Sequence, residues 1–179
     1  MKQKDITTKR LRFRRLKATD LEGWDQFFLS DRAQYVGGGS ESGEALSWRV
    51  FSSLLGHWHL RGTGPFAIEK LEDAQVIGMA GPWYPRGWPE RELTWSLWGA
   101  EYEGFGYATE AVKALRRHVT RDLGWDRIVS YVDPSNAASI KLCESLGCIE
   151  DPNIALPDDD PTMAFVHPVC SPVSKSALT

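Results

Sequence analysis

Two glycines that stand two residues apart, Gly104 and Gly106, separate a run that alternates like a strand from a run with the periodicity of a helix. Glycines at such a junction let the backbone turn sharply and let a ligand approach without meeting a Cβ. The helix that begins at about Tyr107 offers unpaired N–H groups and the positive end of its dipole, and both suit an anion such as a diphosphate. We therefore predict a phosphate-binding segment, called the glycine loop below: Gly104, Phe105, Gly106, Tyr107, Ala108 and Thr109.

The sequence excludes two familiar kinds of phosphate loop. A dinucleotide-binding fingerprint needs a third glycine, and Thr109 stands where that glycine would fall. A Walker loop needs a lysine directly after its last glycine, and no lysine follows Gly106 closely. One structural alternative stays open, because glycines between a strand and a helix often serve only to turn the chain.

Composition limits the classes of protein to consider. The chain has 179 residues, enough for one domain with a sizeable core and too few for two. A net charge of −3 argues against a general surface for nucleic acid or anionic membrane. The three cysteines have no metal-type spacing and indicate free thiols in a reducing compartment. Because the start lacks an apolar run, we expect no secretory signal, no membrane span and a cytoplasmic protein.

Hydrophobic periodicity predicts the elements that must position the glycine loop. A strand, two helices and three strands come first, and the glycine loop and its helix follow the last of these strands. A further strand, a helix and a final strand complete the chain. The predicted strands are 11–14, 66–71, 76–83, 92–98, 128–132 and 162–166, and the predicted helices are 21–28, 41–60, 107–119 and 136–146. The helical crossover after the loop should make strands 92–98 and 128–132 parallel neighbours. We expect one domain over residues 1–168 and a disordered tail over 169–179.

Three motifs in this order resemble the GNAT superfamily of acyl-CoA-dependent N-acetyltransferases. Residues 104–111 resemble its pyrophosphate motif in the form Gly-x-Gly-Tyr-Ala-Thr-Glu-Ala. Residues 136–139 (Asn-Ala-Ala-Ser), followed by Leu146 and Gly147, resemble its second signature. Residues 8–14 resemble the opening of the branch that includes ribosomal-protein N-terminal acetyltransferases. The resemblance covers nearly the whole chain.

The resemblance implies an α/β (α+β) fold with a mixed central sheet of about seven strands and helices on both faces. The sheet would splay open between the fourth and fifth strands, and acetyl-CoA would lie in the gap. The N–H groups of the glycine loop would hold its pyrophosphate, and the backbone near Leu97 and Trp98 would lie along its pantetheine arm. Asn136, Ser139 and Cys143 would also lie beside that arm, and Asn136 could at the same time cap its helix.

The sequence departs from the family pattern at three positions. Glu101 stands where the pyrophosphate motif usually begins with Gln or Arg. Cys143 occupies the place of a tyrosine that many relatives use as general acid, and Cys148 replaces a common aromatic residue. Because an ordinary cysteine titrates near 8.5 and lacks the reach of a phenol, the source of that proton stays open, and water is an alternative.

The resemblance implies transfer of an acetyl group from acetyl-CoA to the primary amine of a protein N-terminus or a small molecule. Such an amine is mostly protonated at neutral pH, so a general base or an ordered water relay is useful. Glu92 is the first candidate base, with a solvated charge at a strand edge as its alternative, and Glu103 is the second. A backbone N–H of Leu97 or Trp98 would polarise the carbonyl. No metal is required.

Four of the eight tryptophans, at positions 83, 88, 95 and 98, lie within sixteen residues. Such clusters usually pack a core or an interface. Because aromatic faces attract ammonium groups, Trp83, Trp88 and Trp95 instead predict a pocket for an amine with an apolar part. The acidic run 158–160 could add negative potential there. The alternative function is a noncatalytic module that binds acyl-CoA or another small ligand with this cluster. We expect a monomer or homodimer.

Overall fold

The computed structural model describes residues 6–157 and 161–169. Its strands form one sheet in the order β1-β2-β3-β4-β5-β6-β8-β7. The strand bounds are β1 Ile6–Thr7, β2 Leu11–Arg15, β3 Phe66–Lys70, β4 Val76–Trp83, β5 Glu92–Leu97, β6 Val129–Val132, β7 Ile149–Glu150 and β8 Met163–Val166. The helix bounds are α1 Leu21–Phe28, α2 Glu44–Arg61, α3 Tyr107–Arg121 and α4 Ala137–Ser145, with a 3-10 helix, η2, at Asp31–Val36. The predicted mixed sheet is confirmed, and the eight strands include two short ones, β1 and β7.

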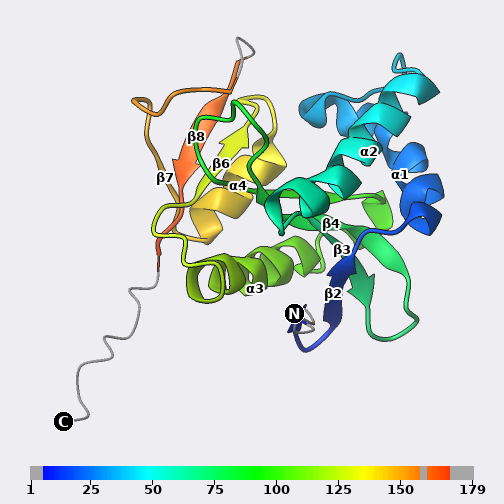
Figure 1. Cartoon of the computed structure of the whole chain (residues 1–179), viewed down its shortest axis with the longest axis horizontal. Coiled ribbons are helices and arrows are strands. Elements are labelled where there is room, and N and C mark those ends of the chain that lie inside the picture. The colour runs from blue at the N-terminus through cyan, green and yellow to red at the C-terminus, as the bar shows by residue number, and fades with distance from the viewer. Residues whose placement is uncertain (1–5, 158–160, 170–179) are drawn as a thin grey trace.

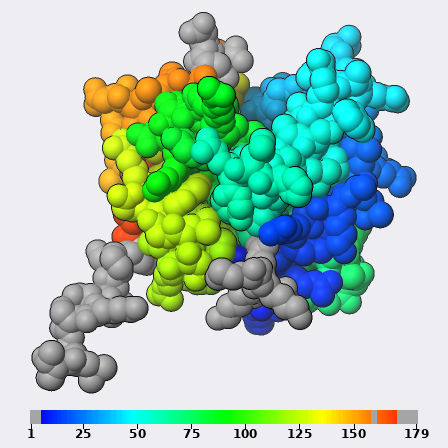
Figure 2. Space-filling view, in the orientation of Figure 1, coloured from blue at the N-terminus to red at the C-terminus, as the bar shows by residue number. Residues whose placement is uncertain are grey.

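The two faces of the sheet carry different helices (Figure 1). Helix α3 buries Ala111, Val112 and Leu115 in one cluster, which also holds residues of β2, β5 and α4. Helices α1 and α2 bury a second cluster that includes Trp24 and Phe51. In the space-filling view, the blue to cyan N-terminal part and the yellow-green to orange C-terminal part form opposite sides of the molecule (Figure 2). Helices thus cover both faces, as the resemblance implied.

Strands β5 and β6 are parallel, whereas every other neighbouring pair in the described sheet is antiparallel. Their ladder pairs only Glu92 with Val129. One residue further along, the Ser130 hydroxyl donates to the Leu93 carbonyl. A side chain here makes the bond that a backbone N–H would make in a continuing ladder. The sheet therefore splays open after this point, between the strands predicted as the fourth and the fifth.

Some elements begin or end at other residues than the sequence predicted, and some predicted features lie outside the described residues. Helix α2 begins at Glu44 instead of 41, and β5 ends at Leu97 instead of Trp98. Cys143 and Cys148 are free thiols, whereas Cys170 lies outside the described residues. The acidic run 158–160 and residues 170–179 of the predicted tail are also outside them. In the described part of the chain, no helix is both long and apolar enough to cross a membrane.

Candidate active site

The splay between β5 and β6 contains two cavities, each of about 620 Å³. One extends along the glycine loop and is called the donor-side cavity below, after the acetyl-CoA expected there. The other extends toward the tryptophans and is called the acceptor-side cavity, after the amine expected there. The residues that line both cavities are Tyr35, Val36, Trp95, Asn136 and Ser139. A ligand in one cavity can therefore meet a ligand in the other at this junction.

The glycine loop has the geometry of an open cradle at the N-terminus of α3. Gly104 and Gly106 have φ values of 79° and 76°, in the left-handed region that favours glycine. No protein atom lies within 4 Å of a Cβ built on Gly104, and the nearest to one on Gly106 is an Arg10 nitrogen at 3.8 Å. The loop residues that line the donor-side cavity are Gly104, Gly106, Tyr107, Ala108 and Thr109. The Phe105 ring is exposed instead, so its predicted contribution is limited to the backbone.

A carboxylate far away in the sequence fixes this loop to the N-terminal hairpin. Glu110, in the first turn of α3, accepts hydrogen bonds from the Thr8 hydroxyl at 2.6 Å and the Arg10 backbone N–H at 3.1 Å. The Arg10 Nε also donates to Glu110 at 2.6 Å, while Arg10 Nη1 donates to the Phe105 carbonyl at 2.9 Å. The same guanidinium lies 4.5 Å from the centre of the Tyr107 ring. These contacts hold the loop and the helix start in one orientation.

Successive residues of β5 direct their backbone N–H and carbonyl groups alternately toward β4 and toward the splayed gap. The Trp98 N–H donates to the Ile77 carbonyl at 2.9 Å, so it is already paired. Leu97 precedes Trp98 and lies opposite Gly78. Because neighbouring residues of an antiparallel strand direct their backbone groups to opposite sides, the N–H and carbonyl of Leu97 point away from β4. That side is the splayed gap. Leu97 thus remains a candidate for polarising a carbonyl, whereas the prediction for Trp98 is wrong.

The Trp98 ring belongs to the core rather than to the cleft. It is 9% exposed and packs edge-to-face against Trp24 at a centroid distance of 6.0 Å. Its indole N–H donates to the Ser96 hydroxyl at 3.2 Å. The other three tryptophans of the cluster, Trp83, Trp88 and Trp95, line the acceptor-side cavity.

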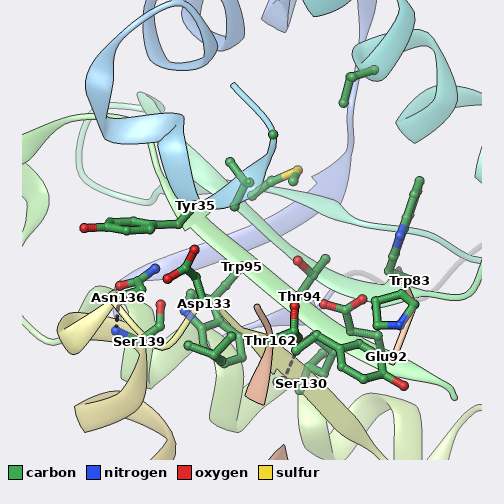
Figure 3. Close-up of a pocket in the computed structure, with 18 of the residues that line it drawn as sticks. Tyr35, Trp83, Glu92, Thr94, Trp95, Ser130, Asp133, Asn136, Ser139 and Thr162 are labelled. Atoms are coloured by element: carbon green, nitrogen blue, oxygen red, sulfur yellow. Dashed lines mark hydrogen bonds between the residues drawn. The ribbon is translucent and has the colours of Figure 1, made fainter. Parts of the chain in front are cut away.

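Glu92 is a buried carboxyl group in the wall of the acceptor-side cavity (Figure 3). Only 6% of the residue is exposed, so the alternative of a solvated edge charge is wrong. Burial raises the pKa of Glu92 to about 8, although the Trp88 indole and the Tyr131 backbone N–H bond to the carboxylate and act in the opposite direction. The Trp88 Nε1 to Glu92 Oε2 distance is 2.8 Å. A carboxyl group with this pKa can exchange a proton near neutral pH.

Comparisons with known proteins agree with this geometry. The sequence model of the acetyltransferase (GNAT) domain matches residues 10–149. The chain belongs to the GNAT family. An acetyltransferase from Agrobacterium tumefaciens str. C58 is 32% identical, with a TM-score of 0.85, and the match covers 93% of this chain and 95% of that one.

Two structures of lower identity share the fold. One is the ribosomal-protein-S5-alanine acetyltransferase from Vibrio fischeri, with 16% identity, a TM-score of 0.67, and coverage of 93% of this chain and 97% of that one. The other is RimL, a ribosomal L7/L12 α-N-protein acetyltransferase in complex with coenzyme A. It has 15% identity, a TM-score of 0.71, and coverage of 93% and 98%. This GNAT protein thus shares its fold with two ribosomal-protein acetyltransferases.

As a member of the GNAT family, the protein is an acetyltransferase that uses acetyl-CoA as acetyl donor. The donor-side cavity fits such a ligand, since it combines the open glycine cradle with the unpaired edge of β5. Neither the glycine cradle nor the edge of β5 needs a metal ion to bind such a ligand. The described residues hold no group of three or more potential metal ligands.

Helix α4 confirms one expectation about the GNAT site and overturns another. Asn136 caps the helix, because its Oδ1 accepts from the Ser139 N–H at 3.1 Å, and both residues line the two cavities. Cys143 has no exposed surface and packs in the core under α3 and α4, so it does not line the cleft as predicted. The hydrogen bond with the neighbouring Cys148 thiol, together with burial, raises the pKa of Cys143, which leaves it protonated. Leu142 and Ser139 face the donor-side cavity from this helix instead.

The second candidate base, Glu103, lies in the wrong cavity for that role. It lines the donor-side cavity, its side chain is 56% exposed, and it forms an ion pair with Arg32 at 2.6 Å. The structure also brings in residues that the sequence reasoning missed. Tyr35 lines both cavities at their junction, and Asp133 and Thr162 line the acceptor-side cavity (Figure 3). No motif surrounds these residues, so only the fold could place them.

Proposed function

We propose that the protein transfers the acetyl group of acetyl-CoA to a primary amine by direct attack of the amine on the thioester. The observation that supports this most is the buried Glu92, whose pKa of about 8 suits a base for an amine. Glu92 lines the acceptor-side cavity at the start of β5, where this strand still pairs with Val129 of β6. A water-exposed carboxylate with an ordinary pKa near 4.3 would be a much weaker base.

Each element of the site has a separate task in this proposal. Acetyl-CoA supplies an acetyl group activated as a thioester. The glycine loop holds its diphosphate with the N–H groups at the start of α3, and Asn136 and Ser139 lie beside its pantetheine arm. The Leu97 N–H donates to the thioester carbonyl. Glu92 accepts a proton from the acceptor ammonium, directly or through water. The neutral amine then forms the C–N bond as the C–S bond breaks. The CoA thiolate leaves and takes up, by way of water, the second proton that the amine nitrogen loses.

The acceptor in this proposal is an amine that carries an apolar part. Trp83, Trp88 and Trp95 supply aromatic walls that attract an ammonium group and exclude water from an apolar substituent. Both a small molecule and a protein N-terminus satisfy this description. The likeness in fold to ribosomal-protein acetyltransferases keeps protein N-termini among the candidates. A panel of aromatic amines, polyamines and peptides with free N-termini, assayed by release of free CoA, would identify the class.

The role of Glu92 is tested with Glu92→Gln, which keeps the shape of the side chain and removes the base. We expect turnover to fall by about 10²-fold and acetyl-CoA affinity to stay unchanged. Wild-type activity should rise with pH through about 8, and part of the lost rate should return at high pH. Glu90→Gln is the matched control, because Glu90 lies on the same segment, near Arg127. Identical pH–rate profiles for wild type and Glu92→Gln would move the role of base to water.

A noncatalytic module would use the same tryptophans but leaves the buried Glu92 without a role. The two functions differ in one measurement, since only the enzyme releases CoA when an amine is added to the acetyl-CoA complex. Acetyl-CoA binding without such release, for every amine of the panel, would favour the module.

A further inference from the structure

Arg32 places a cation at the wall of the donor-side cavity. It belongs to η2, more than seventy residues before the glycine loop, and nothing in its sequence neighbourhood indicates a ligand. Its Nη2 donates to the Glu103 carboxylate at 2.6 Å and to the Leu97 carbonyl at 3.3 Å. Leu97 directs that carbonyl into the splayed gap, and Glu103 directly precedes Gly104. Arg32 thus lies between the open edge of β5 and the glycine loop.

The hydrogen-bonding capacity of this guanidinium is only partly used. Both bonds to described residues come from Nη2. The Nε–H is buried and has no partner among the described residues. Leaving a buried donor without a partner destabilises a folded protein, so such groups generally meet water or a ligand. An arginine with unused donors beside a cavity suits an oxygen-rich anion.

The charges of the donor-side cavity point to the same ligand. Arg32, Glu103 and Lys141 are the charged side chains among its described lining residues. A lone carboxylate next to Gly104 would repel a diphosphate held on the glycine loop. The ion pair with Arg32 offsets that repulsion, while the Leu97 carbonyl also holds the guanidinium beside the cavity. At the start of the glycine motif, where a Gln or Arg is usual, the chain has Glu101, so Arg32 also supplies a cation that the motif lacks.

We propose that Arg32 is a donor-binding residue whose guanidinium contacts the diphosphate of acetyl-CoA. This proposal rests on the assignment of the diphosphate to the glycine loop in the proposed function. Helix η2 also carries Tyr35 and Val36, which line both cavities. Contact of Arg32 with the bound donor would therefore also fix η2 in the wall of the acceptor-side cavity.

The first test is calorimetric titration of the full chain with acetyl-CoA. Arg32→Gln should weaken binding at least tenfold, and Arg32→Lys should recover part of the loss because it restores the charge. Arg49→Gln is the control, since Arg49 is exposed on α2 and its Nε donates to the Ala45 carbonyl of the same helix. Unchanged affinity in Arg32→Gln would overturn the proposal.

The second test separates a phosphate contact from a general effect on the cavity. S-Acetylpantetheine carries the thioester and the pantetheine amides but no phosphate. With this donor and an acceptor from the panel, kcat/KM of Arg32→Gln should equal that of the wild type, while kcat/KM for acetyl-CoA falls. An equal loss with both donors would overturn the diphosphate contact.

A third variant covers the case in which Arg32→Gln fails to fold. Glu103→Gln removes the competing carboxylate and leaves Arg32 in place, so acetyl-CoA binding should become tighter, by about threefold or more. Binding that stays equal or weakens contradicts the proposal. These tests remain distinct from the proposed chemistry. A wild-type protein that binds acetyl-CoA but acetylates no amine would refute the amine acceptor, while the calorimetric comparison of Arg32 variants would still decide the diphosphate contact.

Discussion

Trp88 contributes both an aromatic surface and a hydrogen bond to the acceptor-side cavity. Its ring lies edge-to-face against Tyr131 at a centroid distance of 6.2 Å, while its indole N–H donates to Glu92. Trp83, in the same cavity, stacks on His57 and has no contact of this kind with the carboxylate. Two tryptophans that look alike in the sequence therefore differ in their contact with Glu92.

This difference predicts different results for two similar substitutions. Trp88→Phe keeps an aromatic ring but removes a donor that stabilises the ionised Glu92, so the pKa of Glu92 should rise further. The pH of half-maximal kcat should move upward by about one unit, because a hydrogen bond to a charged group contributes roughly 1.5–3 kcal/mol. Trp83→Phe should leave that pH unchanged. Equal shifts in the two variants would show that the indole N–H of Trp88 does not tune Glu92.

The position of Glu92 could be predicted from the sequence, but its environment could not. A glutamate at the start of a strand is consistent with either a buried base or a solvated charge. Only the fold decides between these two alternatives. Its burial comes from Trp88 on the preceding loop and from Tyr131 on β6, which packs alongside. For Cys143, matching a motif position placed the residue on the right helix, but the direction of the side chain follows from how α4 packs on the core.

The glycine loop is an element whose shape depends on its anchorage at both ends. Gly104 and Gly106 permit the turn, and this part was predicted from the sequence. The contacts of Glu110 with Thr8 and Arg10 were not, because about a hundred residues separate these partners and no local pattern links them. The resemblance covers both segments, residues 8–14 and 104–111, yet gives no reason why they should touch. The structure shows them in direct contact.

A matched pair of glycines tests whether the open space above the loop matters for the donor. Gly106 and Gly124 flank the two ends of α3 and have φ values of 76° and 67°, and a Cβ added to either would meet little or nothing within 4 Å. Alanine should strain the backbone similarly at both, by about 1 kcal/mol. Only Gly106→Ala places a methyl group where the diphosphate must approach, so only this variant should weaken acetyl-CoA binding, by more than tenfold. Calorimetry and thermal denaturation of both variants measure the two effects.

If Gly124→Ala weakened acetyl-CoA binding as much as Gly106→Ala, the effect would belong to the stability of α3 and not to the cradle. Gly106→Val, with a branched side chain at the same position, should exceed the loss of the alanine variant. A folded Gly106→Val protein with wild-type affinity would contradict the assignment of the diphosphate to this loop.

At the scale of the whole molecule, one buried pair of side chains holds the sheet together where its backbone ladder stops. The Ser130 hydroxyl donates to the Leu93 carbonyl and accepts from His167 Nε2 at 2.8 Å, so His167 carries its proton on Nε2. Both residues are almost fully buried. The pair links β5, β6 and the segment after β8 at the apex of the splay. The alternation of β5 and the crossover after it predicted parallel neighbours, but no sequence pattern predicted where their pairing would end.

The buried Glu92 should cost the folded protein stability at alkaline pH. Its pKa is raised from 4.5 to about 8, so between these values the folded state keeps a proton that the unfolded state has released. Its contribution to stability is therefore fully present below pH 4.5 and is lost as pH rises through 8. Glu92→Gln cannot ionise, so its free energy of unfolding relative to wild type should increase by more than ~2 kcal/mol between pH 5 and pH 9. Urea denaturation at both pH values measures this difference.

Glu90→Gln, on the same segment, should follow the wild-type curve, and a Glu92→Gln curve parallel to wild type would mean that Glu92 is already ionised at pH 5. A gain in stability together with the loss of turnover would show that the same desolvation that destabilises the fold supplies the base.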